Sequence, residues 1–446
     1  MTMKKELGQE AIYDARTLGI PRMLILGLQH LFAMFGATVL VPILVTGYGL
    51  PLSIQTTLLM AGLGTLLFHV CTKFKVPAFL GSSFAFLGGF SAVAALDTGK
   101  FAGMSGEEKL PYAMGGIVIA GCLYLVLALL FKLVGAKKVM RYFPPIVTGP
   151  MIILIGLNLA GSAVGNASSC WWLALLSIAV IIVANIWGKG MIKIIPILLG
   201  VVVPYVVALL TGQVDFTTVG EASFLGLQPI VLAKFDLTAI LVMAPIAVAS
   251  MMEHIGDISA ISATTERNFI EDPGLHRTLL GDGLATALAG MFGGPANTTY
   301  GENTGVLALS RVYDPRVIRL AAVYAIILSF TPKFDALVNS VPTAIVGGVS
   351  FILYGMISAV GVRNMVENQV DLTKSRNLLI AAVIFVCGLG FSSGITFRVA
   401  GADVTLTALA IAAIAGVALN AILPGNDYVF GAAGAKGDGS ANLGTY

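Results

Sequence analysis

Charged residues are scarce in this sequence of 446 residues. Only 11% of the residues are charged and 57% are hydrophobic, whereas soluble domains carry roughly 25% charged residues. This composition excludes an ordinary soluble domain and indicates a polytopic membrane protein, whose surroundings are the lipid bilayer. The net charge of +3 is too small to indicate a nucleic-acid-binding surface, so no nucleic-acid partner is expected.

Cysteine and the common catalytic motifs are also lacking. The four cysteines, Cys71, Cys122, Cys170 and Cys387, are scattered through apolar segments with no C-x-x-C spacing. This pattern indicates neither a disulfide framework nor a zinc site. The sequence contains no nucleophile–base pair, metal cluster or phosphate loop. We therefore expect no enzyme activity, no metal and no cofactor.

Long apolar runs account for most of the chain. A bilayer core of ~30 Å needs about 20 apolar residues per helix. The first run, from Met23 to Val45, is too long for the core of a signal peptide and predicts an uncleaved first span. The third and tenth of the predicted spans are short and interrupted. We predict fourteen spans, at residues 22–45, 54–72, 83–96, 111–132, 143–162, 171–188, 192–212, 237–260, 277–292, 301–310, 317–331, 342–361, 377–391 and 404–423.

The distribution of basic residues predicts the orientation. With the N-terminus inside, most of the 26 lysine and arginine residues lie on one side. Only five lie on the other side: Lys100, Lys109, Lys234, Lys333 and Arg398. The positive-inside rule therefore predicts a cytoplasmic N-terminal tail, residues 1–21, and a cytoplasmic C-terminal tail, residues 424–446. The Gly- and Ala-rich C-terminal tail is expected to be flexible, and we assign it no function.

Two weak internal matches indicate a repeat. Residues 28–31 (LQHL) resemble residues 252–255 (MEHI), and residues 77–86 resemble residues 295–302. The second match coincides with the two interrupted spans, which makes chance a poorer explanation. We predict an all-α membrane protein built from a first repeat, residues 22–212, and a second repeat, residues 237–423. Each repeat has seven spans, and because seven is odd the second repeat is inverted in the membrane.

The interrupted spans predict a binding site. Residues 79–84 and 297–300 are expected to be extended and to lead into half-helices. Backbone of this kind is tolerated at membrane depth only where protein buries it or where it lines a wet cavity. Two such strands, one from each half, could pair antiparallel near the middle of the bilayer. Each would then direct a half-helix N-terminus, with its free N–H groups, towards a central cavity that could hold a polar solute.

Few ionisable residues lie inside the spans, where each costs about 2.5–3.5 kcal/mol or more. Glu253, Asp257 and Glu302 are the candidates for the site, and the first two lie four residues apart on one helix face. A capping or paired structural role is the alternative for each, most of all for Asp257. Asp282 has the same alternative and is left outside the site. Phe84 and Tyr300 flank the interruptions and could offer flat faces to a planar ring.

Residues 302–311, ENTGVLALSR, carry the most specific pattern. They resemble the E/Q-N-x-G-x(4)-T-R/K/G signature of the nucleobase–ascorbate transporters, also called the nucleobase:cation symporter-2 family. Gln29-His30 and residues 81–86 match the same family. Within it, residues 33–42 (AMFGATVLVP) and 297–303 (NTTYGEN) resemble bacterial uracil permeases. The resemblance implies a bacterial inner-membrane protein with a core domain, spans 1–4 and 8–11, and a gate domain, spans 5–7 and 12–14. It is also compatible with a homodimer.

The resemblance also assigns residues to a transport site. It implies that Glu253 and Glu302 contact the edge of the base, with Phe84, Tyr300 and Gly301 beside it. Uracil offers two N–H donors and two carbonyl acceptors, which suit carboxylates and backbone amides respectively. Proton-coupled uptake of uracil by alternating access is then expected. The residues expected to couple transport to proton movement are Glu253, Asp257 and His30. Asn303 and Gln29 are expected to support the family motif.

Departures from the family pattern leave alternatives open. Asp257 stands where uracil permeases carry histidine, as in purine-transporting relatives, and Ser310 replaces the usual threonine. Glu302 favours uracil, because xanthine and urate relatives usually carry glutamine there. A xanthine or purine symporter and sodium coupling are the alternatives. An anion exchanger or channel on the same fold is a remote one, since residues 79–90 and 295–310 contain no basic residue. A lone helical histidine such as His30 is also more often a packing residue than a ligand.

Overall fold

The computed structural model describes residues 11–399 and 402–425. The predicted tails therefore lie largely outside the described residues. The elements of the first half are η2 (Ala15–Leu18), α1 (Ile20–Gly47), α2 (Ile54–Cys71), β1 (Leu80–Ser82), η3 (Phe84–Phe86), α3 (Leu87–Ala94), η4 (Gly99–Phe101), α4 (Gly106–Val134), α5 (Ala136–Val139), α6 (Pro145–Asn158), α7 (Ala160–Ala167), α8 (Trp171–Ile186), α9 (Met191–Ile194), α10 (Pro196–Leu210) and α11 (Thr217–Glu221).

The second half also has a short strand between helices, and it has two more strands near its end. Its elements are α12 (Leu237–Met243), η5 (Ala244–Ile246), α13 (Ala247–Thr265), η6 (Ile270–Gly274), α14 (Leu275–Met291), β2 (Asn297–Thr299), α15 (Gly301–Ser310), α16 (Pro315–Ser329), α17 (Pro332–Asn339), α18 (Thr343–Glu367), α19 (Ser375–Gly390), β3 (Ile395–Val399), β4 (Ala402–Leu406) and α20 (Ala408–Ile422).

Every predicted span contains a helix, but the number of crossings is not settled by the helices themselves. By length and composition, six helices among the described residues could cross a membrane, or seven if α16 and α17 count as one bent span. The remaining apolar helices are shorter than the bilayer core is thick. Fourteen crossings and an inverted repeat therefore stay predictions.

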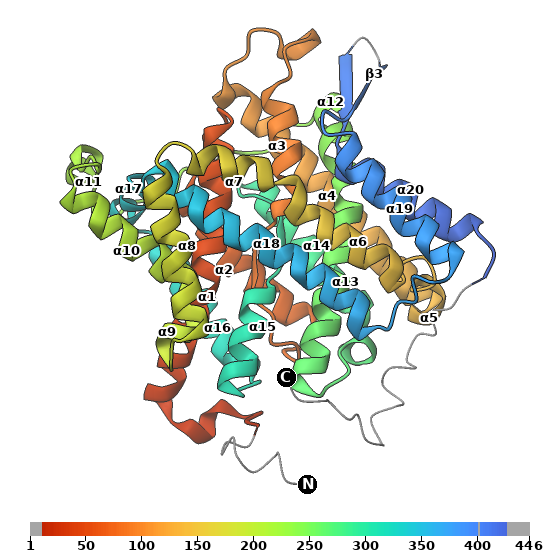
Figure 1. Ribbon diagram of the computed structural model, residues 1–446, viewed down its shortest axis with the longest axis horizontal. Coiled ribbons are helices and arrows are strands. Elements are labelled where there is room, and N and C mark those ends of the chain that lie inside the picture. Colours follow the sequence, from red (N-terminus) through yellow and green to blue (C-terminus); the bar gives the residue numbers. More distant parts are fainter. Residues whose placement is uncertain (1–10, 400–401, 426–446) are drawn as a thin grey trace.

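Helices from the two halves pack against each other rather than forming separate bodies (Figure 1). α14 packs against α4 and α2, and α16 packs against α1 and α2. A second group is made by α18 with α6, α7 and α8, and by α20 with α19. The division into a core domain and a gate domain that move against each other stays a prediction.

The two interrupted spans meet through their strands, as predicted. β1 and β2 pair antiparallel, with Leu80 opposite Thr299 and Ser82 opposite Asn297. Backbone bonds continue the ladder at both ends, from Tyr300 N to Phe79 O (3.0 Å) and from Ser83 N to Ala296 O (2.8 Å). All six strand residues are buried. The pairing satisfies the inner backbone groups of both strands, which buried backbone requires.

The outer edges of this two-stranded sheet are satisfied by threonines of the neighbouring helices. On the β1 side, Thr65 Oγ1 of α2 accepts from Leu80 N (2.9 Å) and donates to Leu80 O (3.2 Å). On the β2 side, Thr286 Oγ1 of α14 accepts from Asn297 N (3.2 Å) and donates to Asn297 O (3.0 Å). Each half thus uses the same device, which leaves no open sheet edge at these positions inside the protein.

Two features correct the sequence-based description. Residues 395–399 and 402–406 pair as the antiparallel strands β3 and β4, so the fold is not helical apart from the two interruptions. The last helix consequently begins at Ala408 and not at residue 404. The hairpin sequence ITFRV…ADVTL is rich in β-branched residues, which favour strands, but counting apolar residues alone assigned part of it to a span. The eleventh predicted span, residues 317–331, corresponds to α16, and α17 follows it after a bend of 89°.

Candidate functional site

A cavity of about 300 Å³ lies beside the paired strands. Its volume is at the lower end for small-molecule pockets. Its lining residues come from α1, β2, α13, α15 and residue Phe84, and from α6, α8, α9, α10 and α18. The cavity is lined by Phe32, Ala33, Phe84, Ile152, Asn185, Lys193, Ile194, Ile195, Pro196, Ile197, Glu253, Asp257, Thr298, Thr299, Tyr300, Gly301, Glu302, Gly305, Val306, Leu309, Met356, Ile357 and Val360.

The α13 wall presents one polar face to the strands. Ser250 Oγ lies 3.3 Å from Ser83 Oγ, just after β1, and Thr299 Oγ1 of β2 donates to Asp257 Oδ2 (2.9 Å). Ser250 and Asp257 are two helical turns apart, so both contacts hold the same face of α13 against the sheet. Glu253 lies between them and lines the cavity. Its Oε2 atom is buried and has no hydrogen-bond partner among the described residues.

The α15 wall begins at the strand pair itself. Tyr300 is the N-cap residue of α15, and no side chain caps the helix. The first-turn N–H groups of α15 therefore have no carbonyl partner within their own helix. Glu302 stands in this first turn and lines the cavity together with Gly301 and Gly305. A Cβ added at Gly305 would meet nothing within 4 Å, so this side of α15 is open.

Two aromatic rings bound the cavity near the interruptions. The Tyr300 hydroxyl donates to Ser82 O (2.9 Å), which fixes the ring against β1. Phe84 follows β1 and is buried. Its ring packs edge to face on Tyr354 of α18, with a centroid distance of 5.7 Å. Sequence reasoning named Phe84 and Tyr300 but missed Tyr354, because a single tyrosine in a long apolar helix carries no positional signal.

The structure does not bring all the predicted residues into the cavity. His30, Gln29 and Asn303 are not among its lining residues. Asn303 Nδ2 instead donates to His30 O (3.1 Å) and lies 3.2 Å from His30 Nδ1. These contacts join α1 to α15 at the residue that follows Glu302. His30 therefore contacts α15 and does not line the cavity, and its part in proton movement stays a prediction.

The second-half counterpart of His30 is also buried away from the cavity. His254 Nδ1 lies 2.9 Å from Asp282 Oδ2, and both side chains are fully buried. Neither residue lines the cavity. Asp282, which the sequence left outside the site, is thus paired with the α13 residue next to Glu253. This arrangement agrees with a structural role for Asp282.

Lys193 is the functional candidate that sequence reasoning missed. It stands on α9, far in sequence from both interruptions, yet it lines the same cavity as the three carboxyl groups. Residues 79–90 and 295–310 contain no basic residue, but Lys193 places a positively charged group at the cavity. Among the described residues, the cavity lining holds three carboxyl groups, one ammonium group and the amide of Asn185. Such a site can accept hydrogen bonds from N–H donors and donate from backbone amides.

Gly81 of β1 shows how closely the site is packed. A Cβ at this position would lie 2.5 Å from Tyr300 ring atoms and 2.8 Å from Thr38 Oγ1. We predict that Gly81→Ala displaces the Tyr300 ring, at a cost of about 1–3 kcal/mol in stability. Uptake of uracil, the substrate that the family resemblance implies, should fall by about tenfold for the protein that is inserted in the membrane. The matched control is Gly88→Ala in α3, where an added Cβ would lie 4.0 Å from its nearest neighbour, Thr407 Cγ2. Equal uptake by the two variants would show that Tyr300 need not be held in place.

The sequence of this chain is similar to those of known permeases. Residues 21–397 match the Xan_ur_permease family, described as a permease family. The chain is 43% identical over 429 residues to a uracil permease of Bacillus caldolyticus, covering 93% of this chain and 94% of the relative. It is 40% identical over 416 residues to a uracil permease of Bacillus subtilis (strain 168), covering 89% and 91%. A uracil permease of Escherichia coli (strain K12) is 38% identical over 408 residues, covering 89% and 90%.

Solved structures with the same fold come from more distant proteins. The transmembrane domain of a cyanobacterium bicarbonate transporter, BicA, superposes with a TM-score of 0.58 at 15% identity, covering 83% of this chain and 95% of that one. The anion transporter SLC26A9 superposes with a TM-score of 0.64 at 11% identity, covering 92% and 66%. At these identities the likeness shows the fold alone. With the apolar helices, the permease relatives show that this chain is a multi-pass membrane protein.

Proposed function

Because this chain belongs to the Xan_ur_permease family, the nucleobase transporter family whose motifs its sequence carries, we propose that it imports uracil by proton symport. The family makes it a transporter and not an enzyme. The observation that carries the proposal is the cavity in which Glu253, Asp257 and Glu302, from two different helices, stand beside the paired strands. An apolar helix bundle would not retain three such groups on one cavity unless they served a polar solute.

Uracil suits the chemistry of the lining. Its ring N–H groups would donate to the carboxylates of Glu302 and Glu253, and the Oε2 atom of Glu253 lacks another partner among the described residues. Its carbonyl oxygens would accept from the uncapped first-turn N–H groups of α15. The rings of Phe84 and Tyr300 would contact the faces of the base. A site of this kind rejects analogues that lack one of these N–H or carbonyl groups. The buried protein atom that would bond the missing group is then left without a hydrogen-bond partner.

Asp257 is the proposed carrier of the coupled proton, with Glu253 as its neighbour on the same face. A carboxyl group that is neutral when the cavity faces outside and charged when it faces inside carries one proton per cycle. Thr299 Oγ1 already donates to Asp257 Oδ2, so the charged form has a partner. His30 would act through Asn303 by holding α15. Sodium is the alternative coupling ion.

We also propose alternating access. The cavity is lined by residues of α1, β2, α13 and α15 together with residues of α6, α8, α9, α10 and α18. Movement of these two groups of elements against each other would expose the cavity to one side of the membrane at a time. We assign the face that carries Arg16, Arg267 and Arg316 to the cytoplasm, in line with the positive-inside rule. A homodimer remains an expectation from the family resemblance.

Lys193 gives a test against anion transport on the same fold. Uracil is neutral, so an exposed ammonium group at the cavity wall should contribute little to its binding, within the 0–1 kcal/mol typical of exposed charges. We predict that Lys193→Gln leaves uracil uptake within about threefold of the wild-type rate. The measurement is initial uptake per inserted molecule, with Lys189→Gln as a control outside the cavity lining. A loss of uptake confined to Lys193→Gln would point to an anionic substrate.

The proposal as a whole is tested by counterflow in proteoliposomes. Vesicles loaded with unlabelled uracil or xanthine are diluted into labelled uracil, and pH and sodium gradients are imposed separately. We expect counterflow with uracil, weak competition by xanthine, and accumulation driven by the pH gradient only. Counterflow with xanthine and not with uracil would show that xanthine, and not uracil, is the substrate. Accumulation driven only by a sodium gradient would show that sodium, and not the proton, is the coupling ion.

A further inference from the structure

The segment before α1 lies across the ends of the two helices that carry the site carboxyl groups. We propose that residues Ile12 to Ala15, here called the N-terminal strap, position α13 and α15 relative to each other and so set the affinity of the transport site. The proposal rests on the proposed function for its substrate. None of the strap residues lines the cavity, so they would act through the helices and not by touching uracil.

The strap is joined first to the end of α15. Ile12 N donates to Arg311 O (2.8 Å) and Tyr313 N donates to Ile12 O (2.8 Å). Ile12 and Val312 thus form a parallel β-bridge. Arg311 is the C-cap residue of α15 and has a left-handed backbone, with φ of 53°. The chain therefore turns away from α15 at the point where the strap holds it.

Tyr13 joins the same segment to the end of α13. Its hydroxyl donates to Thr265 O (2.9 Å), the last residue of α13. Its ring packs on Tyr313 with a centroid distance of 5.5 Å, and the Arg267 guanidinium lies 4.2 Å from the ring centroid. One side chain therefore contacts the residues that follow α13 and those that follow α15. A cation–π contact and a hydrogen bond of this kind contribute about 0.5–1.5 kcal/mol each.

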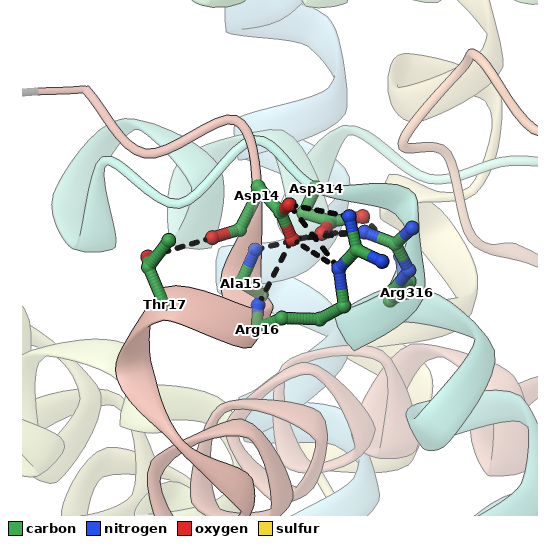
Figure 2. Close-up of polar contacts among 6 residues, drawn as sticks. All are labelled: Asp14, Ala15, Arg16, Thr17, Asp314 and Arg316. Atoms are coloured by element: carbon green, nitrogen blue, oxygen red, sulfur yellow. Dashed lines mark hydrogen bonds and ion pairs between the residues drawn. The ribbon is translucent and has the colours of Figure 1, made fainter.

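A polar cluster anchors the strap to the start of α16 (Figure 2). Ala15 N donates to Asp314 Oδ2 (2.7 Å), and Asp314 Oδ1 accepts from Arg316 N as the N-cap of α16. Arg316 Nη1 bridges Asp314 Oδ2 (2.9 Å) and Asp14 Oδ1 (3.1 Å). Hydrogen bonds from Arg16 lower the pKa of Asp14 to about 2. Asp14 is therefore charged at neutral pH and can pair with Arg316.

The half-helix α15 depends on such an anchor more than a full span would. It has ten residues, it starts at the strand pair, and one of its sides is the cavity wall. Glu302 lies about 12 Å along the helix from Ser310, where the strap begins to hold it, at 1.5 Å per residue. Glu253 lies about 18 Å from Thr265 on the same basis. Because both helices are rigid rods over these lengths, a change at the strapped ends moves the two carboxyl groups relative to each other.

The test compares graded changes in Tyr13. Tyr13→Phe removes the hydroxyl bond to Thr265 and keeps the ring contacts, whereas Tyr13→Ala removes both. Thr17→Ala is the matched control, because the Thr17 hydroxyl donates only to Asp14 O within the strap's own turn (2.8 Å). In proteoliposomes, we expect the KM for uracil to rise by about threefold in Tyr13→Phe and about tenfold in Tyr13→Ala. The kcat per inserted molecule should change by less than about twofold.

A second measurement does not depend on uracil. Spin labels are placed at Ala263 and Ala308, two exposed positions near the ends of α13 and α15, in a background without the four native cysteines. We expect the distance distribution to broaden in Tyr13→Ala and to stay unchanged in Thr17→Ala. An unchanged distribution, or an unchanged KM in Tyr13→Ala, overturns the positioning role. Wild-type vesicles that do not transport uracil would instead overturn the proposed function, and the label distances would still decide whether the strap positions the helices.

Discussion

Glu302→Gln is expected to reduce uracil uptake by about 10- to 100-fold while the protein still inserts into the membrane. The glutamine amide keeps the size of the side chain but replaces one carboxylate oxygen by an N–H₂ donor, which would face a uracil N–H donor. Removing a hydrogen bond to a charged group costs about 1.5–3 kcal/mol, and each 1.4 kcal/mol is a factor of ten. The measurement is kcat/KM for uracil per inserted molecule in proteoliposomes.

The control for this variant is Glu221→Gln. Glu221 ends the exposed helix α11 and does not line the cavity, so the same chemical change there should leave uptake unaltered. Glu302→Gln with wild-type kcat/KM would remove Glu302 from the site. A gain in xanthine uptake by Glu302→Gln would agree with the glutamine that xanthine relatives usually carry at this motif position.

Asp257→Asn is expected to separate transport from its driving force. The asparagine can still accept the Thr299 hydroxyl through its Oδ1 atom, so α13 should stay attached to β2, but it cannot bind and release a proton. With one proton per uracil, a gradient of one pH unit supplies about 1.4 kcal/mol and supports about tenfold accumulation. We predict that this accumulation disappears in Asp257→Asn, whereas uracil counterflow continues. Both are measured on the same vesicles.

Asp371→Asn is the matched control for Asp257→Asn. Asp371 Oδ1 accepts from the Thr373 hydroxyl (2.6 Å) at an exposed position, so it forms the same kind of pair away from the cavity. Its substitution should leave accumulation intact. Undiminished accumulation by Asp257→Asn would exclude Asp257 as the proton carrier and direct attention to Glu253.

The sequence was informative wherever a physical constraint acts locally. Interrupted apolar runs predicted that residues near Leu80 and Asn297 are extended, because unpaired backbone cannot face lipid. The antiparallel pairing of β1 and β2 confirmed it. The scarcity of charge inside the spans likewise singled out Glu253, Asp257 and Glu302, and all three line one cavity.

The features that the sequence did not predict depend on contacts between distant segments. Lys193 reaches the cavity through the placement of α9 beside α15, which no window around the interruptions can contain. Tyr13 contacts residues about 250 and 300 positions away. The β3–β4 hairpin was missed for a different reason. Its residues are apolar enough to extend a span, and only their β-branched character indicates a strand.

The fold alone does not identify the substrate, so the expected substrate is argued from the site. Solved structures that share this fold include a bicarbonate transporter and an anion transporter, but one architecture can host unrelated functions. The cavity of this chain holds three carboxyl groups against one exposed ammonium group. Such a balance disfavours an anion and suits a neutral solute with N–H donors.

The most direct measurement is an experimental structure of the protein with uracil bound. The account predicts a base in the cavity beside the β1–β2 pair, with its edge hydrogen-bonded to the carboxylates of Glu253 and Glu302 and its faces against Phe84 and Tyr300. Uracil bound elsewhere, or bound in this cavity without contact to either carboxylate, would contradict it.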